Sequence, residues 1–218
     1  MQCERDPSAQ PASLIYELPS VVERMDLSAM FTSPQPLEVE LGSGDGSFLA
    51  DFAHLNPNHN FIGVERLLGR LRKLDRKGRR RGLANLRAVR IESAYFLRYL
   101  LPKQAATALH VYFPDPWPKR KHRRHRLINE QFPSLAKQAL ATGGTVFLRT
   151  DDEDYFGQMK EVFGGSTQFQ AVETPPLLAG LTTDFEREFN ARGIATLRAA
   201  YTSITGPPPP APGLGGRC

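Results

Sequence analysis

The sequence predicts an α/β fold with a central, mostly parallel sheet and helices on both of its faces. Short apolar segments of strand length alternate with segments of helical periodicity along most of the chain. A glycine-rich turn joins the first strand directly to the first helix, as in open sheets that bind nucleotides. With 218 residues, of which 40% are hydrophobic and 23% charged, the chain is long enough for one domain with a sizeable core.

Five segments have the length and apolar character of strands, namely residues 37–41, 60–64, 86–91, 108–113 and 144–149. Helical patterns lie between them. Residues 47–55 place Phe48, Leu49, Phe52 and Leu55 on one face and end at Asn56-Pro57, and residues 129–140 end before Gly143-Gly144 in the same way. Residues 66–81 carry leucines at helical spacing. This alternation indicates parallel strands joined by helices, so ligands are expected at the carboxyl ends of the strands.

The two ends of the chain lack such periodicity. Residues 1–36 contain five prolines and are predicted to form an N-terminal arm. Residues 206–218 are rich in proline and glycine, which neither complete a hydrogen-bonded ladder nor pack a core, so a disordered tail is expected there. The functional domain is therefore assigned to residues 37–205.

Composition narrows the class of protein. The 28 Lys and Arg exceed the 23 Asp and Glu, and a formal charge of +5 with a pI near 9.4 favours a polyanionic partner. No apolar run approaches the roughly 18 residues that cross a bilayer, and the N-terminus lacks the layout of a signal peptide, so we expect a cytoplasmic protein without a membrane partner. Cys3 and Cys218 lie at opposite ends of the chain, which disfavours a disulfide framework, a metal site and cysteine catalysis.

The glycine turn reads Glu40-Leu-Gly42-Ser-Gly44-Asp45-Gly46. Its G-x-G-x-G spacing differs from the G-x-G-x-x-G of dinucleotide sites, and the two flanking carboxylates favour a cationic ligand over a pyrophosphate, so a dehydrogenase is the weakest option. Glu65 ends the next strand about 20 residues later, where an acid commonly binds ribose hydroxyls. S-adenosylmethionine, which has an adenosine, a sulfonium and no phosphate, fits this pattern. The alternative is a plain strand-to-helix turn with solvated carboxylates.

A proline-rich turn follows the fourth strand and reads Phe113-Pro-Asp115-Pro-Trp117-Pro-Lys119. Its prolines fix three φ angles and push the residues before them towards extended geometry, which presents Asp115 and Trp117 rigidly at the ligand edge. Residues 119–126 then hold six Lys or Arg, enough to follow several phosphates, while Trp117 or Tyr112 offers a ring for an exposed base. A solvated charged loop is the alternative. For the basic residues within 66–81, solubility and RNA contact stay equally open.

Several of these segments, in their order along the chain, resemble the bacterial TrmB family, the tRNA (guanine-N7)-methyltransferases. They are Glu40-Leu-Gly-Ser-Gly44, Phe61-Ile-Gly-Val-Glu65, the turn from Phe113 to Lys119, Arg149-Thr-Asp151 and Thr183-Asp-Phe-Glu186, and the match runs from about residue 37 to 201. The resemblance implies a Rossmann-like class I S-adenosylmethionine-dependent methyltransferase with a seven-stranded sheet, flanked by helices, whose last hairpin strand is antiparallel. It implies S-adenosylmethionine as cofactor, tRNA as partner and methylation of N7 of a variable-loop guanine.

The resemblance also assigns residues to roles. The cofactor-binding positions are Glu40, Gly42, Gly44, Glu65, Ser93 and Asp115, and Asp115 is also the catalytic residue. The substrate-binding positions are Lys119, Asp151, Thr183, Asp184, Phe185 and Glu186. Without the resemblance, Asp151 and Thr183 are equally good helix N-caps.

The chain departs from the family pattern at two places. Glu92-Ser93-Ala94 stands where the family has an Asp after the third strand; Ser93 is the aligned residue, and a shift of register would bring Glu92 there instead. Asp184 is an acid where a basic residue is common, which weakens any phosphate contact from that side chain. Two rival functions stay open: methylation of an exocyclic base amine, although D-P-W differs from the D-P-P-aromatic turn of that chemistry, and a non-catalytic RNA-binding module. Monomer and homodimer are both open.

Overall fold

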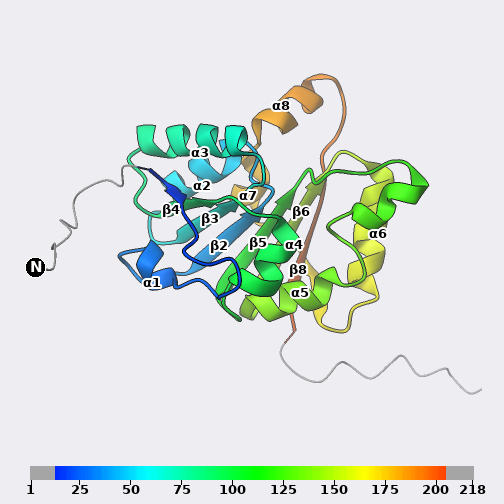
Figure 1. Ribbon diagram of the computed structural model, residues 1–218. Coiled ribbons are helices and arrows are strands. Elements are labelled where there is room, and N and C mark those ends of the chain that lie inside the picture. The colour runs from blue at the N-terminus through cyan, green and yellow to red at the C-terminus, as the bar shows by residue number, and fades with distance from the viewer. Residues whose placement is uncertain (1–12, 205–218) are drawn as a thin grey trace, which may run out of the picture.

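A computed structural model describes residues 13–204, and Figure 1 shows a single sheet with helices on both faces. The sheet has the order β1-β4-β3-β2-β5-β6-β8-β7 among these residues. The strands are β1 (Ile15–Tyr16), β2 (Leu37–Leu41), β3 (Asn60–Val64), β4 (Leu86–Val89), β5 (Ala106–Tyr112), β6 (Leu140–Thr150), β7 (Phe169–Val172) and β8 (Leu197–Ser203). Of the strands in residues 13–204, β8 alone runs opposite to the others, so it is antiparallel to both β6 and β7. The predicted α/β class and the antiparallel hairpin strand are confirmed, and two-residue β1 adds an eighth strand beside β4.

The helices divide between the two faces of the sheet. They are α1 (Leu27–Met30), α2 (Ser47–Leu55), α3 (Leu68–Arg80), α4 (Ser93–Tyr95), the π-helix η1 (Phe96–Leu100), the 3-10 helix η2 (Arg120–His125), α5 (Phe132–Ala139), α6 (Glu153–Gly164), α7 (Pro176–Gly180) and α8 (Asp184–Ala191). One apolar cluster lies between the sheet and α2, α3 and α7, and the other lies under α4, η1, α5 and α6. None of the helices in residues 13–204 is long and apolar enough to cross a membrane.

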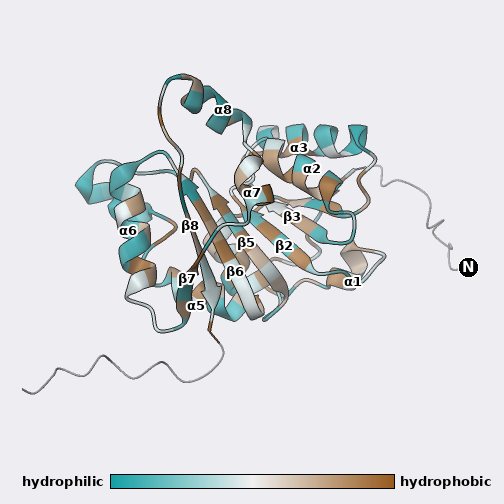
Figure 2. Ribbon diagram, turned by 180° about the vertical axis from the view of Figure 1, so that it is seen from behind, coloured by the Kyte–Doolittle hydropathy of each residue, from teal (hydrophilic) through white to brown (hydrophobic). Residues whose placement is uncertain are grey.

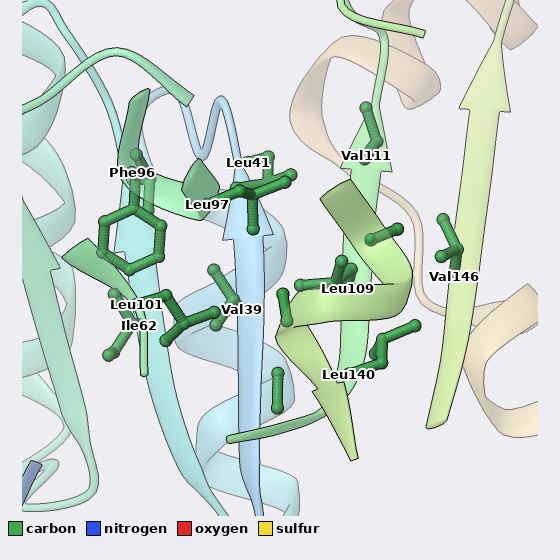
Figure 3. Close-up of a cluster of buried hydrophobic side chains, with 14 of the residues drawn as sticks. Val39, Leu41, Ile62, Phe96, Leu97, Leu101, Leu109, Val111, Leu140 and Val146 are labelled. Atoms are coloured by element: carbon green, nitrogen blue, oxygen red, sulfur yellow. The ribbon is translucent and has the colours of Figure 1, made fainter. Parts of the chain in front are cut away.

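Alternation along the strands creates the two clusters. In β2, Leu37, Val39 and Leu41 enter the cluster under α4 and η1, and the intervening Glu38 and Glu40 face the α2 side. Figure 3 shows the apolar residues of β2 and β3 beside Phe96 and Leu97 of η1, and those of β5 on the side of Leu140 and Val146. Figure 2 shows the same division by hydropathy, with apolar strands inside and a hydrophilic outer surface on α3. In β2 the face under α4 and η1 is therefore apolar, whereas the face towards α2 carries the two buried acids.

The element bounds agree closely with the sequence pattern where an apolar run ends at a turn residue. The helix at residues 47–55 and the strands at 37–41 and 60–64 have the predicted bounds. By contrast, β6 begins at Leu140 instead of residue 144, and α5 begins at Phe132 instead of residue 129. Pro133 stands in the first turn of α5, the position of a helix where proline is tolerated.

Residues 13–36, which lack periodicity in the sequence, pack against the domain. Leu14 is fully buried, and its backbone N–H donates a 2.7 Å hydrogen bond to the carboxylate of Asp75 on α3. Met30 and Phe31 are buried against the other face of the sheet. This segment therefore contributes to both clusters instead of standing apart as an arm. Residues 1–12 and the predicted tail at 206–218 lie outside the described residues.

Candidate functional site

The candidate site lies where the chain reverses its direction across the sheet. From β2 the chain proceeds to β3 and β4 on one side, and it later adds β5 and β6 on the other. Ligands of open α/β sheets bind at the carboxyl ends of strands at such a reversal. Two neighbouring cavities open there, one of about 530 Å³ and one of about 410 Å³. We name the first, which α8 borders, the α8 cavity and the second the Glu65 cavity; both are lined by Gly42, Arg70, Tyr112, Phe113, Pro114 and Asp115.

The glycine turn forms the wall of the α8 cavity. Gly42 and Gly44 have φ angles of 80° and 55°, in the left-handed region that side chains other than glycine rarely adopt. A Cβ atom at either position would meet nothing within 4 Å. The N–H groups of Gly42 and Ser43 both donate to the carbonyl of Val64, at 2.9 Å, which ties the turn to β3. The turn is therefore fixed in place with an open backbone surface towards the cavity.

Glu40 supplies an uncompensated buried carboxyl group beside this turn. The residue is only 3% exposed, and its Oε2 atom has no hydrogen-bond partner in the described part of the chain. Burial raises the pKa of Glu40 well above its usual value; Arg149 opposes this, and Asp45 and Glu65 raise the pKa further. Burial also acts on Asp45, but Lys77, whose Nζ lies 2.8 Å from Oδ2, holds the pKa of Asp45 below its usual value. Glu40 is thus the acid whose ionised form a cationic ligand would stabilise.

The Glu65 cavity contains the second acid of the sequence pattern. Glu65 follows β3, and its Oε1 accepts a 2.8 Å hydrogen bond from the N–H of Leu67, while Oε2 lies 3.8 Å from Arg70. Ser93 and Glu92 both line this cavity. The Glu92 carboxylate accepts hydrogen bonds from two N–H groups of α4, at 2.9 and 2.7 Å, and so caps that helix. The side chain of Ser93 has no such role.

The proline-rich turn places Asp115 between the two cavities. Asp115 is exposed and lines both. Phe113 and Trp117 have φ angles of 49° and 44°, so the extended geometry expected for them is wrong. Such left-handed residues cost about 1–3 kcal/mol each and persist only where their surroundings hold them. The buried guanidinium of Arg126 holds Trp117 by donating from Nε to the preceding carbonyl of Pro116, at 2.7 Å, and the N–H of Phe113 donates to the carbonyl of Arg149 at 2.8 Å.

Arg126 also corrects the interpretation of residues 119–126 as a uniform phosphate-binding run. Its side chain is 1% exposed and binds Asp154 and Gln158 of α6, at 2.6 and 2.7 Å. Arg123 contacts the same Asp154 at 2.9 Å. Two of the six cations therefore attach the turn to α6. The other four cations of this run, Lys119, Arg120, Lys121 and Arg124, are exposed and form no ion pair within residues 13–204. Lys119 precedes η2 and lines neither cavity.

Thr183 and Glu186 hold α8 over the first cavity. They form a capping box, in which the Thr183 hydroxyl accepts from the N–H of Glu186 at 2.8 Å. Glu186 is fully buried; one carboxylate oxygen lies 3.0 Å from Arg149 of β6 and the other contacts Arg198 of β8. Arg149 also donates to the carbonyl of Leu181 at 2.6 Å. This buried ion pair attaches α8 to the sheet, and Glu186 lines neither cavity.

Asp184, Phe185 and Glu188 are the residues of α8 that line the α8 cavity. Phe185 is 44% exposed, and its ring centroid lies 5.0 Å from that of Phe113 and 4.2 Å from that of Phe189. Of these three aromatic residues, Phe113 and Phe185 line the cavity. Asp184 contacts Lys77 at 3.3 Å.

Asp151 lines the α8 cavity, whereas the next residue caps α6. The carboxylate of Asp152 accepts a 2.7 Å hydrogen bond from the N–H of Tyr155. The alternative role of Asp151 as the helix N-cap is therefore wrong. All the predicted site residues except Lys119 and Glu186 thus line one or both of the cavities at the sheet edge. No cluster of side chains suited to a metal ion occurs within residues 13–204.

Sequence reasoning missed three residues that shape the site. Lys77 forms an ion pair with Asp45, Arg149 forms one with Glu186, and Phe113 places an aromatic ring beside Phe185. The sequence offered a hint for two of them, because Phe113 and Arg149 lie within the segments that resemble the family. Nothing in the sequence pairs Lys77 with an acid 32 positions earlier.

Comparison with known proteins adds a family to this geometry. A sequence model of the family described as "Putative methyltransferase" matches residues 34–199. The tRNA (guanine-N(7)-)-methyltransferase of Geobacter metallireducens is 36% identical over 150 residues, which cover 69% of this chain and 71% of that protein. The enzyme of the same name from Thermus thermophilus is 32% identical over 87% of this chain and 61% of its own length. The chain spans less than two thirds of several such relatives, including 48% of that from Paenarthrobacter aurescens.

Solved structures share the fold at low identity. The 16S rRNA methyltransferase KamB has a TM-score of 0.58 and 16% identity over 84% of this chain and 95% of its own. A precorrin-6y C5,15-methyltransferase from Geobacter metallireducens has a TM-score of 0.51 and 12% identity over 79% and 81%. Because these two proteins bear the names of different substrates, the likeness concerns the fold alone.

Proposed function

The chain belongs to the TrmB family, the S-adenosylmethionine-dependent tRNA (guanine-N7)-methyltransferases, and we propose that it transfers a methyl group to N7 of guanosine 46 in the variable loop of tRNA. The observation that carries this proposal is the buried Glu40 carboxyl group with its unpartnered oxygen at the glycine turn. A cationic ligand relieves that desolvated acid, whereas a pyrophosphate would not.

The residues around the two cavities fit S-adenosylmethionine. Glu40 would hold its positively charged methionine end, Glu65 the ribose hydroxyls and Ser93 the adenine. Gly42 and Gly44 leave room for close approach to the backbone. Because the carboxylate of Glu92 already caps α4, Ser93 is the better candidate for the adenine contact. The bound cofactor supplies the methyl group.

Guanine N7 requires little chemistry from the protein. It carries an in-plane lone pair and no proton, so attack on a methyl group needs no general base. What the protein must provide is alignment and tolerance of the positive charge that remains on the purine. Asp115 lies between the two cavities, where its carboxylate stabilises that charge and orients the guanine edge.

The α8 cavity has the features that a flipped purine needs. An enzyme that modifies a base inside folded RNA takes the base out of its stack and holds it against aromatic side chains. Phe185 and Phe113 provide such rings beside the cavity, and Asp151 provides an acceptor on the same wall. Thr183 and Glu186 would then act by positioning α8, and Lys119 by contact with RNA outside the cavities.

The test is transfer of labelled methyl from S-adenosylmethionine to unmodified bacterial tRNA, followed by borohydride and aniline, which cleave RNA at 7-methylguanosine. We expect label in tRNA and cleavage in the variable loop. Label without cleavage would indicate methylation of an exocyclic amine instead. Absence of label, despite cofactor binding in a thermal-shift assay, would favour a non-catalytic RNA-binding module.

A further inference from the structure

The helix α3 presents positive charge alone to solvent. Its 13 residues include seven cations, Arg70, Arg72, Lys73, Arg76, Lys77, Arg79 and Arg80. Its only acid, Asp75, is 8% exposed and faces inward, where it accepts the N–H of Leu14. A helix surface that serves solubility usually mixes both signs, with opposite charges four residues apart.

The arrangement of these cations costs free energy in the isolated protein. Lys73 and Lys77 stand four residues apart, as do Arg72, Arg76 and Arg80 in succession, and like-charged pairs at that spacing destabilise a helix. Few acids relieve this repulsion. Within residues 13–204, Lys77 pairs with Asp45 and Asp184, Arg70 and Arg79 each approach one carboxylate at 3.8 Å, and the other four cations form no ion pair.

The charged face begins at the candidate site. Arg70 lines both cavities and Lys73 lines the α8 cavity, and Lys77 joins α3 to α8 through Asp184. At 3.6 residues per turn, Arg76 and Arg80 continue the same surface along the outside of the helix, away from the cavities. Figure 1 shows α3 extending from the neighbourhood of α8 across the outer surface of the molecule. The helix is about 20 Å long, enough to follow several nucleotides.

We propose that the exposed face of α3, formed by Lys73, Arg76 and Arg80, binds the phosphate backbone of the RNA strand beside the methylated guanine. This inference rests on the proposed function, because it assigns a path to the same substrate. The exposed cations of η2 form a second positive surface beside the Glu65 cavity, which Trp117 and His125 line. An RNA strand that crosses the cavities thus meets cations on both sides, and phosphate contacts fix its position without reading its sequence.

The test compares tRNA binding by two double variants that lose the same charge. Arg76→Gln with Arg80→Gln removes two cations of α3 that line neither cavity and pair with no acid in the described chain. Lys103→Gln with Lys160→Gln is the matched control: Lys103 precedes β5, at the opposite edge of the sheet, and Lys160 is exposed on α6. A third variant, Arg76→Lys with Arg80→Lys, keeps the charge.

Each phosphate contact contributes about 0.7–0.9 to the slope of log Kd against log salt, so loss of two contacts should lower the slope by about 1.4–1.8. At about 0.15 M salt, this corresponds to a Kd for unmodified tRNA that is roughly ten- to thirtyfold higher. We expect the control and the lysine variant to retain most of the affinity. The Kd for S-adenosylmethionine should be unchanged in all of them, which shows that the fold is intact.

The outcomes separate this inference from the proposed function. If the wild-type protein binds tRNA without methylating it, and only the α3 glutamine variant loses affinity, the inference that α3 binds phosphates is supported and the proposed function is wrong. If the wild-type protein methylates tRNA and the α3 glutamine variant keeps its salt slope, or the control loses as much as α3 does, the inference is overturned. A wild-type protein that does not bind tRNA overturns both.

Discussion

Asp115 is the residue on which the proposed chemistry depends most directly. Its exposed carboxylate touches both cavities and forms no ion pair in residues 13–204, so its replacement should disturb reactivity more than folding. We expect Asp115→Ala to lower the rate of methyl transfer at saturating cofactor by about 10²–10³, the usual effect of losing one group that stabilises transition-state charge. Single-turnover transfer, tRNA affinity and circular dichroism should be measured together. Retained transfer with normal tRNA affinity would remove this residue from the mechanism.

Glu40 should couple cofactor binding to proton release. Burial raises the pKa of Glu40 well above its usual value in the free protein, so the group retains a proton where an ordinary carboxyl group has lost it. A cationic ligand favours the ionised form, and binding must therefore expel that proton. The affinity for S-adenosylmethionine should rise with pH up to the raised pKa and level off above it. Titration calorimetry in buffers of different ionisation enthalpy measures the released proton; equal heats in all buffers would contradict this prediction.

The same carboxyl group should make the free protein less stable as pH rises. A group whose pKa is higher in the folded than in the unfolded state stabilises the fold below its unfolded pKa, and that contribution is lost as pH rises towards the folded pKa. Glu40→Gln removes the titration. In the absence of cofactor, this variant should melt at a higher temperature than the wild type at neutral pH and should bind cofactor more weakly. A lower melting temperature would show that Glu40 has a partner the fold requires.

At the scale of elements, Asp151 and Asp152 divide two tasks between adjacent positions. Asp152 caps α6, and Asp151 lines the α8 cavity. Asp152→Ala should cost about 1 kcal/mol of unfolding free energy, the usual value of an N-cap, with tRNA affinity unchanged. Asp151→Ala should do the opposite, raising the KM for tRNA with little change in stability. Urea unfolding and steady-state kinetics on both variants provide the comparison, and the two variants behaving alike would count against this division.

This pair also shows how far the sequence predicts the elements. Both aspartates are good caps by type, and the choice between them depends on a helix boundary one residue apart, which local pattern does not determine. The bounds of β2 and β3 were predictable because each apolar run ends at a glycine or an acid. The burial of Arg126 and Arg149 was not, since their partners Asp154 and Glu186 lie 28 and 37 positions away and are found only after the chain folds.

At the scale of the whole molecule, a buried polar network joins the strands that carry the site. Glu38 of β2 is 7% exposed, and its two carboxylate oxygens lie 2.7 Å from His59, just before β3, and 2.7 Å from His110 of β5. His110 in turn lies 2.8 Å from the hydroxyl of Tyr112, whose ring lines both cavities. This network fixes the three central strands relative to one another, so the positions of Glu40, Glu65 and Asp115 at their ends depend on it.

The network should govern the stability of the protein towards acid. Burial raises the pKa of Glu38, but hydrogen bonds and charge from His110 and His59 outweigh it, and the pKa lies below its usual value of 4.5. A carboxylate whose pKa is lower in the folded state contributes stability above its unfolded pKa, and this is lost as pH falls through the folded pKa. Glu38→Gln should therefore lower the free energy of unfolding by about 1–3 kcal/mol at neutral pH, because a buried hydrogen bond is left unmade. Below about pH 4.5, the free energy of unfolding should fall less steeply with pH than it does in the wild type. Glu130→Gln, at an exposed position without an ion pair in the described residues, is the control. Urea unfolding from about pH 3 to pH 7 tests both variants. If the loss of stability at low pH is the same in Glu38→Gln as in the wild type, other groups cause it.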